Sequence, residues 1–421
     1  MTVLLLATTT GYQIRSFSDA ARALDVRLVF GSDRCDHLDD PWRDAAIPVR
    51  FHDLAGSTRR IVEAFGGTPP DGVLAVGDRP SVLDAHAAEA FGLRGNPPEA
   101  AARSRNKRAA REAFQAAGLL TPEYRHVPVE SDARALADGQ SYPVVVKPLG
   151  LSGSRGVMRA DNAASFVAVF TRLRRLLGSI DIRLERDQLH DAALIEAFIP
   201  GREFAVEGVL TAGAFSPFAI FDKPDPLDGP FFEETIYVTP SRADEHTQRS
   251  IVTSVAAAAR ALGLVHGPVH AECRVNDQGV YVLEVAARPI GGLCSRALRF
   301  MHRGKTVSLE EVLLRHAIGD PLDDTGRELR ASGVMMIPIP HRGVFRGVDG
   351  EELARGLALI EAVHITAKPD TLLTPLPEGR SYLGFIFAAG DTPDAVEQAL
   401  RAAHRQLVFR IDRDLPIVVP A

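Results

Sequence analysis

Residues 270–288 read HAECRVNDQGVYVLEVAAR, two apolar runs on either side of an Asn-Asp-Gln-Gly turn. This pattern predicts a β-hairpin folded about residues 276–279. Each predicted strand carries one carboxylate among hydrophobic neighbours, Glu272 on the first strand and Glu284 on the second. Opposed positions in a hairpin bring Cβ atoms within roughly 5 Å, so we expect the two glutamates to lie next to each other across the ladder.

Two carboxylates at that separation repel each other and favour a cation or a shared proton between them. At about 4 Å the repulsion is about 1 kcal/mol in water and several-fold larger at the effective dielectric of a protein. Oxygen ligands with room for phosphate oxygens favour Mg²⁺, which binds one or two carboxylates together with substrate phosphates. The alternative is a pair of solvated glutamates on the open face of a sheet. Arg288 shares a strand face with Glu284 and precedes a Pro-Ile-Gly-Gly turn, which favours a phosphate site.

A second segment, YPVVVKPLGLSGSRGV at residues 142–157, joins a β-branched run to a glycine-rich loop. The run delivers Lys147 to the start of the loop. Glycines let backbone N–H groups approach a polyphosphate, and the lysine supplies a point charge. The loop is not a Walker loop, because the lysine precedes the glycines and no Gly-Lys-Ser/Thr ends it. An ordinary glycine-rich connection between strands is the alternative.

A third segment, ALIEAFIPGREFAVEG at residues 193–208, places Glu196 near the end of one apolar run and Glu203 near the start of the next. A Pro-Gly turn separates the two runs. A segment of this kind can offer backbone groups to a purine edge and a carboxylate to ribose hydroxyls. A plain turn between two strands would have almost the same sequence, so this segment alone decides nothing.

The order of these segments, preceded by Lys107 in a Ser-Arg-Asn-Lys-Arg stretch, resembles that of the ATP-grasp superfamily. The resemblance implies three sets of contacts. The ATP phosphates would meet Lys107, Lys147, Ser152, Gly153, Ser154 and Gly156. The adenosine would meet the backbone of Glu196, Ala197 and Phe198 and, at the ribose, the side chain of Glu203. The ligands of Mg²⁺, with Mn²⁺ as an alternative ion, would be Glu272 and Glu284.

One position departs from the family pattern. Members commonly have Asn two residues after the second metal-binding glutamate, and this chain has Ala286 there. One metal ligand is therefore absent or replaced by water or by another side chain. The departure leaves the number of metal ions open, but it leaves the expectation of ATP binding unchanged.

Two further segments resemble the L-amino-acid ligase branch of the superfamily. The loop PFFEETIYVTP at residues 230–240 resembles its substrate loop, which implies that Glu234 lies near the incoming ammonium as a counter-ion or base. Tyr237 stands where those ligases often have His. The resemblance also implies substrate contacts from Arg288, Gly291 and Gly292. A solvated loop is the alternative, but the segment LPEGRSYLGF at 376–385 independently resembles the C-terminal domain of the same branch.

Length and composition fit a multidomain globular enzyme. The chain has 421 residues, of which 46% are hydrophobic, and a formal net charge of -6, which argues against nonspecific binding to nucleic acid or to anionic membranes. Its three cysteines, Cys35, Cys273 and Cys294, are too few and too scattered for a disulfide framework, which suits the cytoplasm. The N-terminal apolar run is too short for a signal peptide or a membrane span. We expect small-molecule partners and no membrane; the oligomeric state, including a homodimer, stays open.

The order of predicted elements gives the domain organisation. Strands and helices alternate up to residue 91, which predicts an N-terminal parallel α/β domain over residues 1–97. A nucleotide- and metal-binding region follows over 98–302, with a lid subdomain at 140–208. It opens with a helix predicted at 98–117, whose cations other than Lys107 we expect to face solvent, and a helix at 247–262 packs behind the hairpin. Predicted strands at 334–340, 362–368 and 381–387, with a helix from Thr392 to Leu407, form a C-terminal α+β domain over 303–421.

The sequence therefore predicts an ATP-dependent carboxylate–amine ligase with an ATP-grasp fold, α/β and α+β in class. A substrate carboxylate would become an acylphosphate, Arg288 would steady the carboxylate and then the oxyanion, and an amine would displace phosphate to leave an amide and ADP. Two alternatives stay open. One is an ATP-grasp enzyme with another acceptor, of the carboxylase or purine-pathway type, and the other is a non-catalytic nucleotide-binding protein. The sequence identifies neither substrate.

Overall fold

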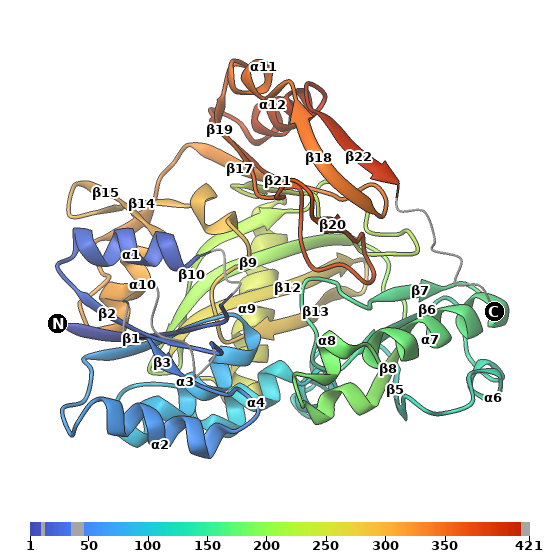
Figure 1. Cartoon of the computed structure of the whole chain (residues 1–421), viewed down its shortest axis with the longest axis horizontal. Helices are drawn as coiled ribbons and strands as arrows, with labels where there is room; N and C mark the ends of the chain where they lie inside the picture. The colour runs from blue at the N-terminus through green and yellow to red at the C-terminus, as the bar shows by residue number, and fades with distance from the viewer. Residues whose placement is uncertain (10–12, 35–45, 414–421) are drawn as a thin grey trace.

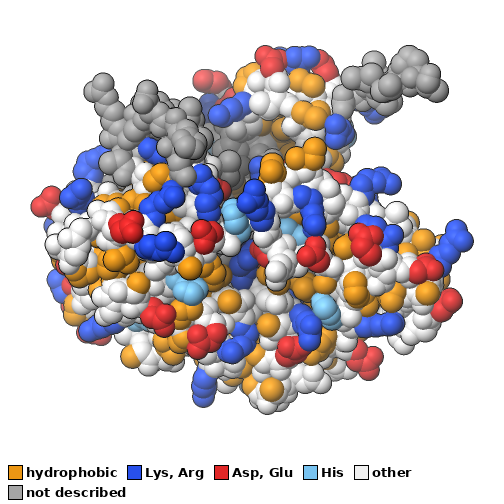
Figure 2. Space-filling model, turned by 60° about the horizontal axis from the view of Figure 1, so that its bottom comes forward, with side chains coloured by type: hydrophobic (Ala, Val, Ile, Leu, Met, Phe, Trp, Pro, Cys, Tyr) orange, Lys and Arg blue, Asp and Glu red, His pale blue; other side chains and the backbone are white. Residues whose placement is uncertain are grey.

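The computed structural model describes residues 1–9, 13–34 and 46–413 (Figure 1). Cys273 and Cys294 are buried free thiols, and Cys35 lies outside the described residues. Figure 2 shows Lys and Arg side chains intermixed with Asp and Glu on one face of the molecule. Within the described ranges, no helix combines the length and the apolar character that a membrane span requires.

The N-terminal part is a parallel sheet of strand order β3-β2-β1-β4, which confirms the predicted parallel α/β domain. Alternate residues of the first strand face opposite sides. Val3 and Leu5 pack with the first helix, whereas Leu4 and Leu6 pack with the second and third helices. The elements are β1 (Thr2–Ala7), α1 (Ile14–Ala23), β2 (Arg27–Ser32), β3 (Ile47–Pro48), α2 (Leu54–Ala64), β4 (Gly72–Val76) and α3 (Asp78–Phe91).

The prediction of a single helix at 98–117 is wrong, because the structure has two helices there, α4 (Pro98–Arg105) and α5 (Lys107–Ala116). Asn106 between them is extended, and its side chain accepts hydrogen bonds from the N–H groups of Arg108 and Ala109. Asn favours this capping position because its oxygen satisfies N–H groups at a helix start. The expectation that the neighbouring cations face solvent is also wrong for Arg111, whose side chain is fully buried.

A small antiparallel sheet of order β5-β8-β6-β7 carries the glycine-rich loop. It runs from residue 124 to residue 197 rather than over the predicted 140–208, because the strand after residue 201 pairs with the central sheet instead. The long helix of this subdomain buries Phe166, Phe170 and Leu173 against the sheet. The elements are β5 (Tyr124–Pro128), α6 (Ala133–Ala137), β6 (Val144–Pro148), β7 (Met158–Ala160), α7 (Ala163–Leu177), α8 (Ile180–Arg183), η1 (Gln188–Asp191) and β8 (Ala192–Ala197).

The central sheet has eight strands in the order β13-β12-β9-β10-β11-β17-β21-β19, all antiparallel to their neighbours. It crosses the predicted boundary at residue 303, because β11 pairs with β17 of the C-terminal region. The predicted helix behind the hairpin is confirmed as α9, which packs against β13. The elements before the boundary are β9 (Arg202–Thr211), β10 (Ala214–Asp222), β11 (Ile236–Thr239), α9 (Glu245–Leu262), β12 (Gly267–Asn276), β13 (Gly279–Ala286), η2 (Cys294–Ala297) and β14 (Arg299–His302).

Most of the C-terminal region lies at the top of Figure 1, whereas α10 packs against α1 of the N-terminal part, and the three predicted strands are confirmed as β17, β19 and β21. The predicted helix is confirmed with Thr392 as its cap, and it ends at His404. The elements are β15 (Lys305–Ser308), α10 (Leu309–Ala317), β16 (Thr325–Arg327), β17 (Ala331–Ile337), β18 (Gly343–Asp349), α11 (Glu351–Arg355), β19 (Ile360–Ile365), β20 (Leu372–Leu373), β21 (Gly384–Gly390), α12 (Pro393–His404) and β22 (Val408–Arg413).

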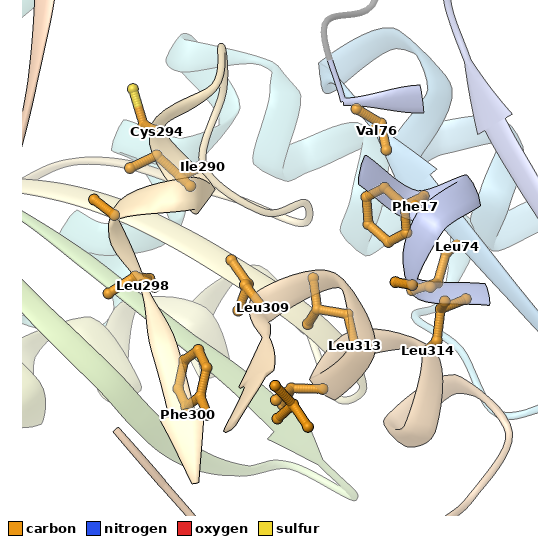
Figure 3. Close-up of a cluster of buried hydrophobic side chains, with 14 of the residues drawn as sticks. Phe17, Leu74, Val76, Ile290, Cys294, Leu298, Phe300, Leu309, Leu313 and Leu314 are labelled. Carbon is orange, nitrogen blue, oxygen red and sulfur yellow. The ribbon is translucent and has the colours of Figure 1, made fainter. Parts of the chain in front are cut away.

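One hydrophobic cluster joins the N-terminal sheet to the segment that follows the hairpin (Figure 3). Phe17 of α1 and Leu74 of β4 belong to this cluster together with side chains from residues 290–314, among them Phe300 and Leu314. All four of these side chains are buried. Packing of this density fixes where the carboxyl end of β4 lies relative to the hairpin. That end, with Asp78 just beyond it, therefore faces the same space as the hairpin glutamates.

Asp84 on α3 gives a test of this packing. Its Oδ1 is buried without a hydrogen-bond partner among the described residues, and burial raises the pKa of its carboxyl to about 7. A raised pKa means that the folded state favours the protonated form, so folding loses stability as pH rises from the unfolded pKa toward 7. We expect the stability gained by Asp84→Asn to grow by about 3 kcal/mol between about pH 5 and about pH 8, measured by urea unfolding. Glu89→Gln on the exposed side of α3 is the control, and an equal pH dependence in both variants would contradict the prediction.

Candidate active site

A cavity of about 400 Å³ lies where the N-terminal, small and central sheets meet. All the predicted site residues except Gly156 line it, although they come from distant parts of the sequence. They are Lys107, Lys147, Ser152, Gly153, Ser154, Glu196, Ala197, Phe198, Glu203, Glu234, Tyr237, Glu272, Glu284, Arg288, Gly291 and Gly292. Convergence of cationic and anionic groups in one concave space is what a binding site for charged small molecules requires.

The hairpin has the predicted register, with Glu272 of β12 directly opposite Glu284 of β13. A bulge directly after Glu272 shifts the register of the remaining pairs. A different lysine neutralises each glutamate, since Lys223 Nζ lies 3.2 Å from Glu272 and Lys107 Nζ lies 3.2 Å from Glu284. The repulsion expected from the sequence is therefore relieved by two cations of the chain. The assignment of both glutamates as metal ligands stays a prediction.

Three carboxylates surround the buried ammonium of Lys223. Its Nζ lies 2.8 Å from Glu203, 2.6 Å from Glu234 and 3.2 Å from Glu272. Burial would lower the pKa of Lys223, but the three charges outweigh burial and raise it well above its ordinary value. Sequence reasoning missed this lysine, because the only local signal is a Lys-Pro pair directly after an apolar strand.

The same carboxylates form a candidate metal centre, since one oxygen from each of Glu203, Glu234 and Glu272 lies within 4.8 Å of the others. An oxygen-only set of this kind fits a hard divalent cation. Burial raises the pKa of Glu234 to about 7, with Lys223 opposing the shift. Glu234 can therefore accept or release a proton near neutral pH, which a base requires.

Lys147 reaches the cavity from β6 and is held by Glu196 of the neighbouring β8 strand at 2.5 Å. The second partner of Glu196 is the buried Arg111, at 2.7 Å. Burial would raise the pKa of Glu196, but Arg111 and Lys147 outweigh it and hold the value at about 2. Glu196 thus positions Lys147. Sequence reasoning missed Arg111, because it stood in a run of cations typical of a solvated helix face.

The glycine-rich loop covers one side of the cavity. Lys107 donates to the carbonyl oxygen of Leu151 at 2.8 Å, which ties the start of α5 to this loop. Gly153 has a φ of 62°, and Ser154 also has a positive φ, so the loop turns sharply beside the cavity. Gly156 does not line the cavity. It packs against α7 instead, where an added Cβ would lie only 3.1 Å from Leu173 and Leu176. Its role is close packing.

The segment predicted to face adenine crosses the cavity after β8. The N–H of Ala197 donates to Glu123 O at 2.9 Å, and that of Phe198 donates to Pro143 O at 3.0 Å. Hydrogen bonds to a purine would therefore come from other backbone atoms of this segment. The Phe198 ring packs against the guanidinium groups of Arg159 and Arg274, at 4.2 and 5.1 Å from the ring centroid.

Arg288 is paired with Asp78, which the N-terminal domain supplies. Arg288 Nε lies 2.8 Å and Nη2 lies 3.2 Å from the two carboxylate oxygens of Asp78. Burial would raise the pKa of Asp78, but Arg288 lowers it below its ordinary value. Sequence reasoning missed Asp78. The available signal was its position directly after the carboxyl end of a parallel strand, where ligands commonly bind in α/β sheets.

The predicted substrate residues line the end of the cavity near Arg288. Tyr237 is buried on β11, and its ring centroid lies 5.1 Å from Lys223 Nζ. The turn at Gly291 and Gly292 is fastened through its neighbour Ile290, whose N–H donates to Glu207 at 3.1 Å. Glu207 of β9, distant in sequence, therefore holds the turn in place beside Arg288.

His270 fills the ladder position opposite Ala286, the site of the missing asparagine. Its Nδ1 contacts Glu207, and its Nε2 lies 3.6 Å from Glu272. Burial would lower the pKa of His270, but Glu207 raises it to about 9. A cation of the chain thus lies next to Ala286, where the ATP-grasp resemblance leads us to expect Asn.

Comparisons with known proteins match two parts of the chain to known domains. Residues 140–297 match the ATP-grasp domain, and residues 335–412 match the L-amino acid ligase C-terminal domain 2. Alanine–anticapsin ligase of Bacillus subtilis is 30% identical over 221 residues, which is 49% of this chain and 46% of that protein. The match therefore spans about half the length of that relative.

Solved structures show the same fold over nearly the whole chain. The L-amino acid ligase from Bacillus licheniformis has a TM-score of 0.81 and 26% identity, covering 97% of this chain and 99% of its own. Carboxyaminoimidazole ribonucleotide synthase from Aspergillus clavatus, complexed with ATP, has a TM-score of 0.69, 14% identity and coverage of 95% and 97%. The latter likeness shows the fold alone.

The chain has the ATP-grasp fold, and its residues 140–297 match the ATP-grasp domain. The predicted resemblance is confirmed. Within that fold, residues 335–412 match the L-amino acid ligase C-terminal domain 2, and the whole chain is similar in structure to the L-amino acid ligase from B. licheniformis.

Lys223 provides a test of the charge balance in the cavity. Lys223→Met would leave three carboxylates close together with one cation fewer, so we expect a loss of about 3–5 kcal/mol in the free energy of unfolding. Mg²⁺ should restore part of that loss, because a bound cation replaces the missing charge. Urea unfolding with and without Mg²⁺ measures both effects. Lys305→Met at an exposed position is the control, and a loss no larger than in the control would contradict the prediction.

Proposed function

We propose that this chain is an ATP-dependent carboxylate–amine ligase, which joins an amino acid carboxylate to an amine and releases ADP and phosphate. One observation carries the proposal. A single cavity contains two phosphate-type cations, Lys107 and Lys147, a set of carboxylates, and Arg288 beside a glycine turn. The names of the B. subtilis and B. licheniformis relatives indicate ligation of amino acids, and the C-terminal domain match supports the same branch.

The donor set of the cavity fits Mg·ATP. Glu272 and Glu284 would hold Mg²⁺ or Mn²⁺, with Glu203 and Glu234 adjacent to Glu272. When bound, the ion supplies charge neutralisation for the phosphates. Lys107 and Lys223 now lie against the hairpin glutamates, so binding of Mg·ATP would turn these lysines toward phosphate oxygens or toward other carboxylates.

Residues of the chain then perform the remaining tasks. Lys147, fixed by Glu196, places a charge where the transferred phosphoryl group becomes more negative. Arg288, fixed by Asp78, binds the substrate carboxylate and later the oxyanion of the tetrahedral intermediate. Glu234 accepts a proton from the incoming ammonium, which frees the amine to displace phosphate from the acylphosphate. The products are an amide, ADP and phosphate.

The general test is a screen for phosphate release over amino acids, singly and in pairs, with the mass of each product measured. The proposal expects ADP formation that depends on a second amine-bearing substrate and a product whose mass equals the two substrates less water. Release that depends on bicarbonate would favour the carboxylase type, whose fold this chain shares. Mg·ATP binding without turnover across the panel would favour a non-catalytic nucleotide-binding protein.

Glu284→Gln removes one proposed metal ligand at nearly constant volume. We expect turnover to fall by at least about a hundredfold, because the carboxylate charge that binds the ion is lost. The expected change in unfolding free energy is small, since Glu284 is partly exposed. Phosphate release and urea unfolding measure the two effects, and undiminished turnover would remove the hairpin from the mechanism.

Arg288→Ala should retain Mg·ATP binding and lose amide formation, because the residue acts on the carboxylate substrate. The change leaves Asp78 without its arginine partner, so Asp78→Asn/Arg288→Ala serves as the matched variant in which that charge is also removed. Calorimetric titration with Mg·ATP and product mass separate the two roles. Loss of nucleotide binding in both variants would reassign Arg288 to the nucleotide.

A further inference from the structure

The glycine-rich loop is bonded to a loop of the C-terminal domain, residues 374–382, here named the clasp loop. The N–H of Gly156 donates to Pro377 O at 2.9 Å. Arg155 Nε donates to Glu378 O, also at 2.9 Å. Two hydrogen bonds thus connect segments more than two hundred residues apart, at the point where the glycine loop ends.

The Glu378 side chain adds a second connection, to the helix that packs beneath the glycine loop. Arg172 of α7 donates from Nε and Nη2 to the two carboxylate oxygens, at 2.6 and 2.8 Å. The Arg172 guanidinium also lies 5.1 Å from the ring centroid of Phe231. A bidentate pair with a stacked guanidinium holds its geometry better than a single-contact surface ion pair.

The clasp loop itself is tightly turned. The N–H of Gly379 donates to Pro375 O at 2.8 Å, and a Cβ at Gly379 would lie only 1.9 Å from Thr374 O. The turn therefore presents the carbonyl and the carboxylate of Glu378 from one fixed position. Two residues further on, Arg380 lines the main cavity together with Ser152 and Ser154 of the glycine loop.

We propose that Glu378 is a positioning residue that holds the glycine loop closed over the cavity. Its carboxylate accepts hydrogen bonds from Arg172 of α7, and its carbonyl oxygen accepts one from Arg155 of the glycine loop. The same turn places Arg380 in the wall of the cavity. Closure over the nucleotide is thus tied to docking of the C-terminal domain. The inference rests on the proposed function, since ATP is the ligand that the glycine loop would cover.

The expected consequence is specific to binding and to exclusion of water. A loop that is closed for a smaller fraction of the time lowers the apparent affinity for ATP in proportion to that fraction. It also exposes the acylphosphate to water, which converts ligation into ATP hydrolysis. The chemical groups that act on the phosphates are unchanged, so turnover at saturating ATP changes less than the KM for ATP.

The experiment compares Glu378→Gln with the wild-type chain. We expect the KM for ATP to rise about tenfold and the ADP formed per amide to rise several-fold, with kcat reduced less than about threefold. Asp394→Asn is the matched control. It removes another carboxylate of the C-terminal region from an arginine pair, Arg242–Asp394 at 2.7 Å, at a position that does not contact the glycine loop. Equal KM values and equal ADP-to-amide ratios in both variants would overturn the proposal.

A charge swap separates positioning from a general loss of structure. Arg172→Glu/Glu378→Arg restores an ion pair with reversed polarity, so we expect the KM for ATP to return at least halfway to the wild-type value on a logarithmic scale. Arg172→Glu alone should resemble Glu378→Gln or be worse. A double variant no better than either single variant would overturn the role of the ion pair.

Hydrogen exchange of residues 150–157 keeps this test independent of turnover. Without nucleotide, these amides should exchange faster in Glu378→Gln than in the wild type, and unchanged exchange would overturn the clasp. A non-hydrolysable ATP analogue with Mg²⁺ should protect them in the wild type. Failure of the analogue to bind or protect would instead overturn the proposed function, whatever the result for Glu378→Gln.

Discussion

Compensation of buried charge is the constraint on which the structure depends. Lys223 lies among three carboxylates, Glu196 between two cations, and Arg288 against Asp78. Each set would be costly in a low-dielectric interior if one member were missing. The Lys223 set lies within the central sheet, whereas the Asp78–Arg288 pair forms only when the N-terminal part docks beside that sheet. Assembly of the fold therefore completes the charge compensation of the site.

This arrangement also explains how the cavity can accept a highly charged ligand. The cations that would contact phosphates already lie against glutamates of the chain, so the charges of the site's own residues largely compensate one another. A ligand that carries both a divalent cation and phosphate groups can take over these pairs. The cation then pairs with the glutamates and the phosphates with the lysines, so little uncompensated charge is added. Preorganised dipoles and charges of this kind need little rearrangement when the reaction begins.

The sequence predicted the local features well and the long-range ones poorly. The hairpin register, the parallel N-terminal sheet and the strand-borne Lys147 followed from alternation, turn residues and spacing. Lys223, Asp78 and Arg111 did not, because each becomes significant only through a partner far away in the chain. The break at Asn106 was missed although its capping preference was readable. Hydrophobic periodicity continued across it and outweighed that signal.

The pairing of β11 with β17 has a consequence for evolution and for engineering. Because this ladder makes the C-terminal region a continuation of the central sheet, excising that region would leave β11 as a bare edge open to aggregation. Recombination between relatives would have to preserve the pairing of β11 with β17, in which Tyr237 lies opposite Val334. Selectivity is therefore expected to diversify through point changes and loop exchange, and transplantation of whole modules is disfavoured.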